Sequence, residues 1–175
     1  MNMEKAPPVA PPCELPPAWA ALFDGERLAD KHADAAILAT VDSEGWAHTC
    51  FLSAGEVLAL DDKRIYIAVW PRSRTAGNLR TQRRAVLLAA LDGVVWDARM
   101  DVRCCGNGAR NDDPLVFEGR IIGVRRHSAP YAHVKHLVGF TLHDRDAVIA
   151  RWSNQIDMLR AAAAADTGAA ASQRP

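Results

Sequence analysis

Residues 70–85, WPRSRTAGNLRTQRRA, gather groups that would bind an anion. Ser73 and Thr75 supply hydroxyls and Arg74 a guanidinium, where the apolar segment RIYIAVW (64–70) gives way to helical spacing. Ser73 is a favourable helix N-cap, and the first N–H groups of a helix have no partner inside it. Free N–H groups beside an arginine suit the oxygens of a phosphate monoester. The stretch therefore predicts a phosphate site, with solvated arginines as the alternative.

The remaining arginines of this stretch are not predicted to bind a nucleic acid. The 175 residues include 21 Lys and Arg and 21 Asp and Glu, so the formal net charge is zero. A protein that binds the nucleic-acid backbone needs a basic surface that releases counterions. We expect Arg80, Arg83 and Arg84 to be solvated charges that complement the negative end of the helix dipole, and we assign no role to Arg72.

The cysteines and histidines predict no metal site. Cysteines stand at 13, 50, 104 and 105 without a C-x-x-C pair, which argues against a disulfide framework or a zinc site, and Cys104 is expected to be buried. His133 and His136 share a helical spacing, and packing is their expected role, with a metal or a haem as the alternatives. No apolar run approaches the roughly 20 residues of a membrane span. We expect reduced thiols, a cytoplasmic protein and no membrane partner.

The elements that position these residues are mostly strands. Strand–turn–strand units are predicted over 35–53, 56–70 and 85–105, followed by a long strand at 115–126 and a short one at 138–142. Helices are predicted over 18–23, behind Ser73, and from near Asp144, the last with an apolar stripe made of Val148, Trp152, Ile156 and Leu159. Successive hairpins with a packing helix predict an antiparallel barrel rather than βαβ units.

The chain is predicted to hold one domain between two tails. Residues 1–17 are rich in proline and form a flexible arm or a segment that lies over another surface. The domain covers residues 18–165. Residues 166–175 are predicted to be a disordered tail.

Three segments, in this order, resemble the FMN-binding split-barrel family that is named for pyridoxamine 5′-phosphate oxidase. They are AAILATVDSEGWAHTCFLSAG (35–55), RIYIAVWPRSRTAGNL (64–79) and VGFTLHDRDAVIARW (138–152). The middle segment is the most specific, because Ser73-Arg74-Thr75 and Leu79 match a family pattern. The resemblance implies a mainly β, six-stranded antiparallel split barrel with flanking helices. It also implies a homodimer with flavin at the subunit interface.

The resemblance also implies which residues bind the cofactor. Ser73, Arg74 and Thr75 would hold the FMN phosphate. The ribityl chain and the ring would be lined by Cys50, Phe51, Leu52, Val69 and Trp70. Asn78 either contacts the cofactor or has a structural role. Arg99 and Arg103 either contribute to the site or pair across strands with Asp97, Asp101 or Glu118.

The function implied is that of an FMN-dependent oxidoreductase, in which a reduced nicotinamide-type donor gives a hydride to the flavin. The flavin would pass electrons to a small organic acceptor or to oxygen. The oxidase itself has an arginine where this chain has Cys50, a lysine near Gly55 and a C-terminal strand with an arginine, so pyridoxamine phosphate oxidation is not expected. No catalytic side chain is predicted, since the flavin carries the hydride. A flavin carrier or sensor without turnover and a haem-binding split barrel are the alternatives.

Overall fold

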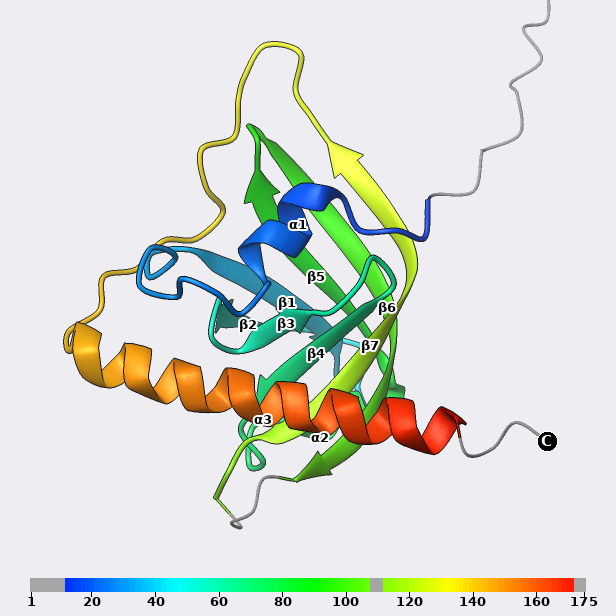
Figure 1. Cartoon of the computed structure of the whole chain (residues 1–175). Coiled ribbons are helices and arrows are strands. Elements are labelled where there is room, and N and C mark those ends of the chain that lie inside the picture. The colour runs from blue at the N-terminus through cyan, green and yellow to red at the C-terminus, as the bar shows by residue number, and fades with distance from the viewer. Residues whose placement is uncertain (1–11, 108–111, 172–175) are drawn as a thin grey trace, which may run out of the picture.

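The fold is one antiparallel sheet that curls into a half-barrel, with helices on its outside and at its ends (Figure 1). The computed structural model describes residues 12–107 and 112–171. The strand order is β2-β1-β5-β6-β7-β4-β3. The strands are β1 (Ala35–Val41), β2 (Ala47–Ser53), β3 (Val57–Ala59), β4 (Arg64–Val69), β5 (Arg84–Leu91), β6 (Val94–Asn107) and β7 (Leu115–His127). The predicted split barrel is confirmed, with seven strands in place of six.

Turn chemistry fixes the first hairpin. β1 and β2 pair from Ala35 opposite Ser53 to Val41 opposite Ala47. In the turn between them, the Asp42 carboxylate accepts hydrogen bonds from the backbone N–H groups of Glu44 and Trp46. Gly45 takes a positive φ of 88°, a conformation that glycine adopts without a Cβ clash. Cys50 and Phe51 are thereby held at fixed positions on β2, an outer strand of the sheet.

The wall formed by β4 and the first five residues of β7, 115–119, is buried on both faces. Ile65 and Ile67 point into an inner core that also contains Trp19 and Leu79. Tyr66 and its neighbours on the other face belong to a second core beneath the last helix. Double burial explains why the segment 64–70 reads as a nearly continuous apolar run instead of an alternating one.

Three helices complete the fold: α1 (Pro17–Leu22), α2 (Arg74–Gln82) and α3 (Arg145–Ala171). Figure 1 shows α3 lying across the outside of the sheet, over β3 and β4. The predicted stripe on α3 is confirmed, because Trp152, Ile156 and Leu159 are buried and Val148 packs against the same core. The helix runs to Ala171, so residues 166–171, which were predicted to be a tail, are helical; residues 172–175 lie outside the described part.

The described end of the Pro-rich segment lies on the sheet. The Val124 N–H donates to the Pro12 carbonyl at 2.7 Å, and the Leu15 N–H donates to Asp62 at the same distance. Leu15 is buried. Of the two alternatives for the arm, residues 12–15 therefore follow the one in which the segment covers a surface, and residues 1–11 lie outside the described part.

The predicted strand at 138–142 is wrong. Gly139 makes one isolated bridge, to Asp34, and the neighbouring residues form no strand. β2 pairs with all of β1, and β5 pairs with Ile37–Ala39, so the bridge to Gly139 falls on the residue just before β1. His133 and His136 lie in the same loop, between β7 and α3, and do not share a helix.

The exposed end of β6 corrects the prediction for Cys104. The inward face of β6 is buried at Ala98, Met100 and Val102, as the alternation predicts, but Cys104 is exposed. The pairing of β6 with β7 is irregular between Cys104 and Gly106, so the alternation does not continue to the end of the strand.

None of the described helices is long and apolar enough to cross a membrane.

Candidate functional site

The candidate site is the junction where β4 ends and α2 begins. Ser73 is the N-cap of α2, as predicted, because its Oγ accepts a hydrogen bond from the Ala76 N–H at 3.1 Å. The same hydroxyl donates to the Trp70 carbonyl at 2.7 Å. Its only proton is therefore directed inside the turn. Ser73 shapes the junction, and a ligand would have to replace Trp70 to receive that proton.

The first turn of α2 leaves donors without partners. Within the described part of the chain, the N–H groups of Arg74 and Thr75 make no hydrogen bond, whereas those of Ala76 and Gly77 bond back to Ser73. The Arg74 side chain is exposed and forms no ion pair with a described residue. No acidic residue stands in this turn. Two amides and the positive end of the helix dipole therefore meet at this turn, and the exposed Arg74 side chain starts from it.

Beneath this turn, Thr75 connects the helix to β2. Thr75 is buried, and its side chain hydrogen-bonds Cys50, which is half-buried. Burial raises the pKa of the Cys50 thiol above its ordinary value, and the bond to Thr75 offsets only part of that effect. The thiol therefore stays protonated and neutral at physiological pH, so it is not an activated nucleophile.

Asn78 has a structural contact one turn further along α2. Its buried side-chain N–H donates to the Thr40 hydroxyl on β1 at 3.0 Å, and that hydroxyl donates to the His48 carbonyl on β2 at 3.3 Å. The chain of bonds ties the helix to two strands. This geometry accounts for Asn78 without a ligand.

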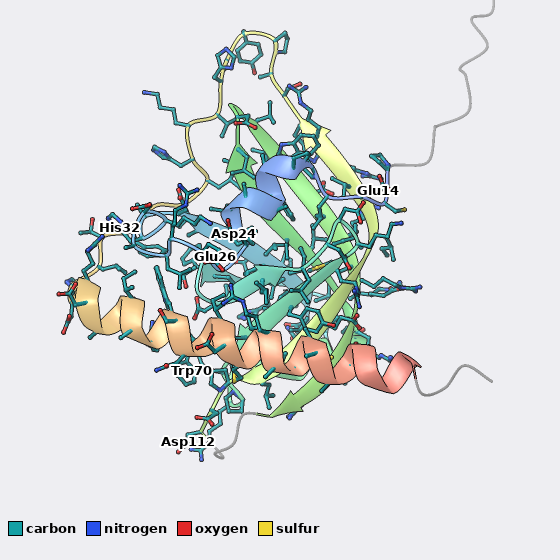
Figure 2. All side chains as sticks on the ribbon, viewed as in Figure 1. Glu14, Asp24, Glu26, His32, Trp70 and Asp112 are labelled. Atoms are coloured by element: carbon teal, nitrogen blue, oxygen red, sulfur yellow. The ribbon has the colours of Figure 1, made fainter. Side chains whose placement is uncertain are left out.

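The apolar residues predicted to line the cofactor divide into two groups. Phe51 and Trp70 are 63% and 48% exposed, so their rings are open to a ligand. Figure 2 labels Trp70, which lies beside α3 in that view. Leu52 and Val69 instead contribute their side chains to the inner core. Only the backbone of these two residues is left to contact a ligand.

Sequence analysis missed a polar residue on the other side of Trp70. Trp70 lines a cavity of about 430 Å³ that is bounded by α3 and by residues 112–114. Gln155, on α3, also lines this cavity and is buried, and its side-chain carbonyl has no hydrogen-bond partner among the described residues. In the sequence, Gln155 is distinguished only as a polar residue directly before Ile156 of the apolar stripe.

Comparison with known proteins places the chain in a family. No family model matches it. The protein YclD of Bacillus subtilis, which is uncharacterized, is 30% identical over 142 residues, covering 79% of this chain and 91% of YclD. The chain belongs to the YclD family.

Solved structures agree with this fold. A protein from Lactobacillus delbrueckii, predicted to be a pyridoxamine 5′-phosphate oxidase, superimposes with a TM-score of 0.52 at 15% identity, covering 65% of this chain and 95% of its own. HupZ of Group A Streptococcus superimposes with a TM-score of 0.51 at 11% identity, covering 69% and 98%. This member of the YclD family therefore has the split-barrel fold of pyridoxamine 5′-phosphate oxidase-like proteins.

In a second charged cluster of this YclD relative, the charged groups already bond to one another. Arg103 on β6 hydrogen-bonds and ion-pairs with Glu118 on β7 and with Asp166 on α3, so the predicted cross-strand pairing of Arg103 is confirmed. The bond from Arg103 lowers the pKa of Asp166, and burial is the main cause that raises the pKa of Tyr66 to about 12. Cys105, Glu118 and Asp166 place their ligand atoms within 4.8 Å of one another. Because Arg103 already bonds both carboxylates, the group is better explained as an ion-pair network than as a metal site.

The other arginines near α2 lie away from its N-terminal turn. Arg80, Arg83 and Arg84 are exposed at the far end of the helix, where Arg83 takes a left-handed φ of 54° and its N–H donates to the Leu79 carbonyl. This position agrees with the prediction of charges that complement the dipole. Arg72, which had no predicted role, approaches Asp112 at 3.8 Å, with both side chains almost fully exposed.

Proposed function

We propose that the N-terminal turn of α2 binds the phosphate of FMN and that the protein is an FMN-dependent oxidoreductase. The observation that carries the proposal is the set of donors without partners in the described structure: the N–H groups of Arg74 and Thr75 and the Arg74 guanidinium. A phosphate monoester has three oxygens and about two negative charges, which this set matches in number and sign.

The surroundings of the turn suit the rest of the cofactor. Trp70 stands three residues before the N-cap and Phe51 lies on β2, and both rings are exposed. A flavin ring is flat and aromatic, so it gains from contact with such side chains. Cys50, held by Thr75, offers a neutral half-buried thiol rather than a charge at this place.

When bound, FMN would supply the hydride-transfer chemistry. The chain's own residues would fix the cofactor and set the local charge. Arg74 and the two free amides would hold the phosphate, and Trp70 and Phe51 would orient the ring. The small-molecule substrate and the electron donor, for which we propose a reduced nicotinamide, would be positioned by other parts of the protein.

We also propose that the protein is a homodimer. Val41 on β1 and Ile122 on β7 are 45% and 42% exposed, and both line a hollow of about 330 Å³ on the outer face of the sheet. A second copy of the chain would cover these apolar side chains. Replacement of Ile122 by glutamate should then shift the mass measured by light scattering from dimer to monomer, and a wild-type protein that is monomeric at all concentrations would contradict the dimer.

The four cysteines form no disulfide in the structure, which suits the reducing cytoplasm that we propose as the location.

The absorption spectrum of the purified protein tests the proposed cofactor. We expect the two-banded spectrum of a flavin, either at once or after addition of FMN at micromolar concentration, and acid should release FMN. A protein that stays colourless and takes up no FMN contradicts the proposal, and a Soret band would establish the haem alternative instead.

Turnover separates an enzyme from a carrier. NADH or NADPH should bleach the bound flavin, and a panel of small acceptors or oxygen should restore its colour over many cycles. Flavin that stays oxidised with every donor would favour a carrier or sensor.

A further inference from the structure

We propose that a basic hollow at the far end of α2 binds the diphosphate group of a small molecule. The hollow has a volume of about 560 Å³ and lies where α2 gives way to β5, beside β6 and β7. Its charged lining consists of four arginines and two carboxylates: Arg83, Arg84, Arg103, Arg120, Asp101 and Glu118. The proposed phosphate turn is at the opposite end of this nine-residue helix, so the basic hollow is a second site and does not rest on the proposed function.

Two consecutive arginines of the basic hollow are accessible and have no acidic partner. Arg83 and Arg84 are both exposed, and the side chain of neither forms an ion pair or a hydrogen bond with a described residue. A guanidinium can donate two parallel N–H bonds to a pair of phosphate oxygens. Two such groups lining one hollow match the several oxygens and negative charges of a diphosphate.

The carboxylates near the hollow leave its charge positive. Glu118 ion-pairs with Arg103, which also bonds Asp166 on α3, and Asp101 pairs with Arg120 at 3.4 Å. Even with Asp166 counted, three carboxylates face four arginines, so one formal positive charge is left over. A concave surface with one sign of charge raises the local concentration of the opposite ion.

The backbone of Arg83 is in a conformation that would suit glycine better. Arg83 ends α2 with a left-handed φ of 54°, where a Cβ is disfavoured and glycine is the usual residue. Its N–H donates to the Leu79 carbonyl, and its own carbonyl accepts a bond of 2.8 Å from the Val102 N–H on β6. The residue is therefore held between helix and sheet. Strain of this kind concentrates at functional sites, which favours a role for the Arg83 side chain.

Arg120 adds a third guanidinium to the same hollow. Its pair with Asp101 joins two side chains that are largely exposed, and such pairs hold their members weakly. Arg120 is therefore free to turn toward a bound anion. Arg103 instead stays in its network with Glu118 and Asp166.

The size of the basic group favours a small molecule over a nucleic acid. Two arginines without partners and a third that can turn suffice for one diphosphate. A nucleic-acid backbone would require contacts to many phosphates along a basic surface, and the chain has no net charge.

Calorimetric titration of Arg74→Ala with inorganic pyrophosphate at low ionic strength tests the proposal. This variant is used because it removes the arginine of the other proposed phosphate site. We expect it to bind one pyrophosphate per chain, at least tenfold more tightly than sulfate, which has a single tetrahedral centre. No binding at millimolar concentration, or equal affinity for the two anions, would overturn the proposal.

Arg83→Gly, made in the same Arg74→Ala background, tests the assignment to this hollow. Arg83 is chosen because Arg84 also lines the apolar hollow proposed for the dimer contact. Pyrophosphate should bind at least tenfold more weakly, whereas the melting temperature should be equal or higher, because glycine relieves the left-handed backbone. An arginine with a merely structural role would not give this combination.

Arg80→Ala, in the same background, is the matched control. Arg80 is an exposed arginine in the last turn of the same helix and does not line the hollow. Its replacement should leave pyrophosphate affinity within twofold. An unchanged affinity in Arg83→Gly, or equal losses in the two variants, would overturn the assignment to the basic hollow.

Titration with FMN separates this proposal from the proposed function. If the sites are separate, Arg83→Gly in otherwise wild-type protein should leave FMN affinity unchanged. Equal losses of FMN and pyrophosphate affinity would indicate a single phosphate site and overturn the second one. Protein that binds pyrophosphate through Arg83 and does not bind FMN would support the basic hollow and overturn only the flavin assignment.

Discussion

Two arginines of this protein stand in opposite surroundings. Arg103 lies between Glu118 and Asp166 and joins β6, β7 and α3 through two ion pairs. Arg74 is exposed at the start of α2, without an acidic residue in the turn, and the two backbone amides beside it bond to no residue that the structure describes. The first arginine has its partners inside the fold, and the second has donors to offer a ligand.

The difference shows that residue type alone does not identify a site. Cys105, Glu118 and Asp166 are three side chains of metal-ligating types, yet Arg103 already forms ion pairs with both carboxylates. The two buried amides Asn78 and Gln155 differ in the same way, since Asn78 bonds Thr40 and the carbonyl of Gln155 has no partner among the described residues. A ligand can reach a group only where that group is accessible, as the Arg74 side chain is.

The largest expected effect is the loss of FMN affinity when Arg74, which pairs with no described acidic residue, is replaced. Arg74→Ala should weaken FMN binding by about 1.5 to 3 kcal/mol, because a charge-assisted contact to phosphate is lost. The unfolding free energy should change by less than about 0.5 kcal/mol, since the exposed Arg74 side chain forms no ion pair or hydrogen bond with the described residues. Fluorescence titration with FMN and urea unfolding measure the two quantities. An affinity equal to that of wild type would place the phosphate elsewhere.

Arg103, which already has two acidic partners, should show the reverse pattern, in which its replacement changes stability and not FMN affinity. Arg103→Ala should lower the unfolding free energy by about 2 kcal/mol, because two partly buried carboxylates lose their partner while the guanidinium is itself partly exposed. FMN affinity should be unchanged. Arg120→Ala is the control, since its pair with Asp101 at 3.4 Å is exposed and should be worth less than about 0.5 kcal/mol. Equal stabilities of the two variants in urea would mean that Arg103 does not hold α3.

Replacement of Asn78 tests whether this buried amide has a structural role. Asn78→Ala should lower the unfolding free energy by about 1 kcal/mol, because the Thr40 hydroxyl loses its buried donor. FMN affinity should stay within twofold of wild type if the role of Asn78 is structural. A tenfold loss of affinity, measured in the same titration, would instead make Asn78 a cofactor residue.

The smallest expected effect is a dependence on pH. Arg103 lowers the pKa of Asp166 below its ordinary value of 3.8, so this pair stabilises the protein fully above that pH and loses its contribution as the pH falls below it. The difference in unfolding free energy between wild type and Arg103→Ala should therefore narrow between pH 6 and pH 3. Urea unfolding at both values checks this, and a difference that widens at low pH would have the wrong sign.

Most of the fold could be predicted from local patterns. The hairpin at Asp42–Gly45, the N-cap at Ser73 and the stripe on α3 each depend on residues close in sequence, and all three are confirmed. The strand predicted at 138–142 failed because a strand needs a partner distant in the sequence, and Gly139 makes only one isolated bridge, to Asp34. Cys104 failed for a related reason, since the irregular pairing of β6 with β7 is not visible in either strand alone.

The candidate site was predictable in position but not in detail. The triplet Ser73-Arg74-Thr75 located the junction. The sequence did not show that the Ser73 hydroxyl donates to Trp70, that Leu52 and Val69 face the core, or that Gln155 lines a cavity beside Trp70. Each of these facts depends on which atoms are left without a partner after α2, α3 and the sheet have packed, and a pattern of residue types does not contain that information.

The most direct test of the account compares FMN with riboflavin, which has the same ring and ribityl chain and no phosphate. We predict that wild-type protein binds FMN at least tenfold more tightly than riboflavin, and that Arg74→Ala removes most of this preference. Equal affinity of the wild-type protein for the two flavins would contradict the claim that the first turn of α2 is a phosphate site.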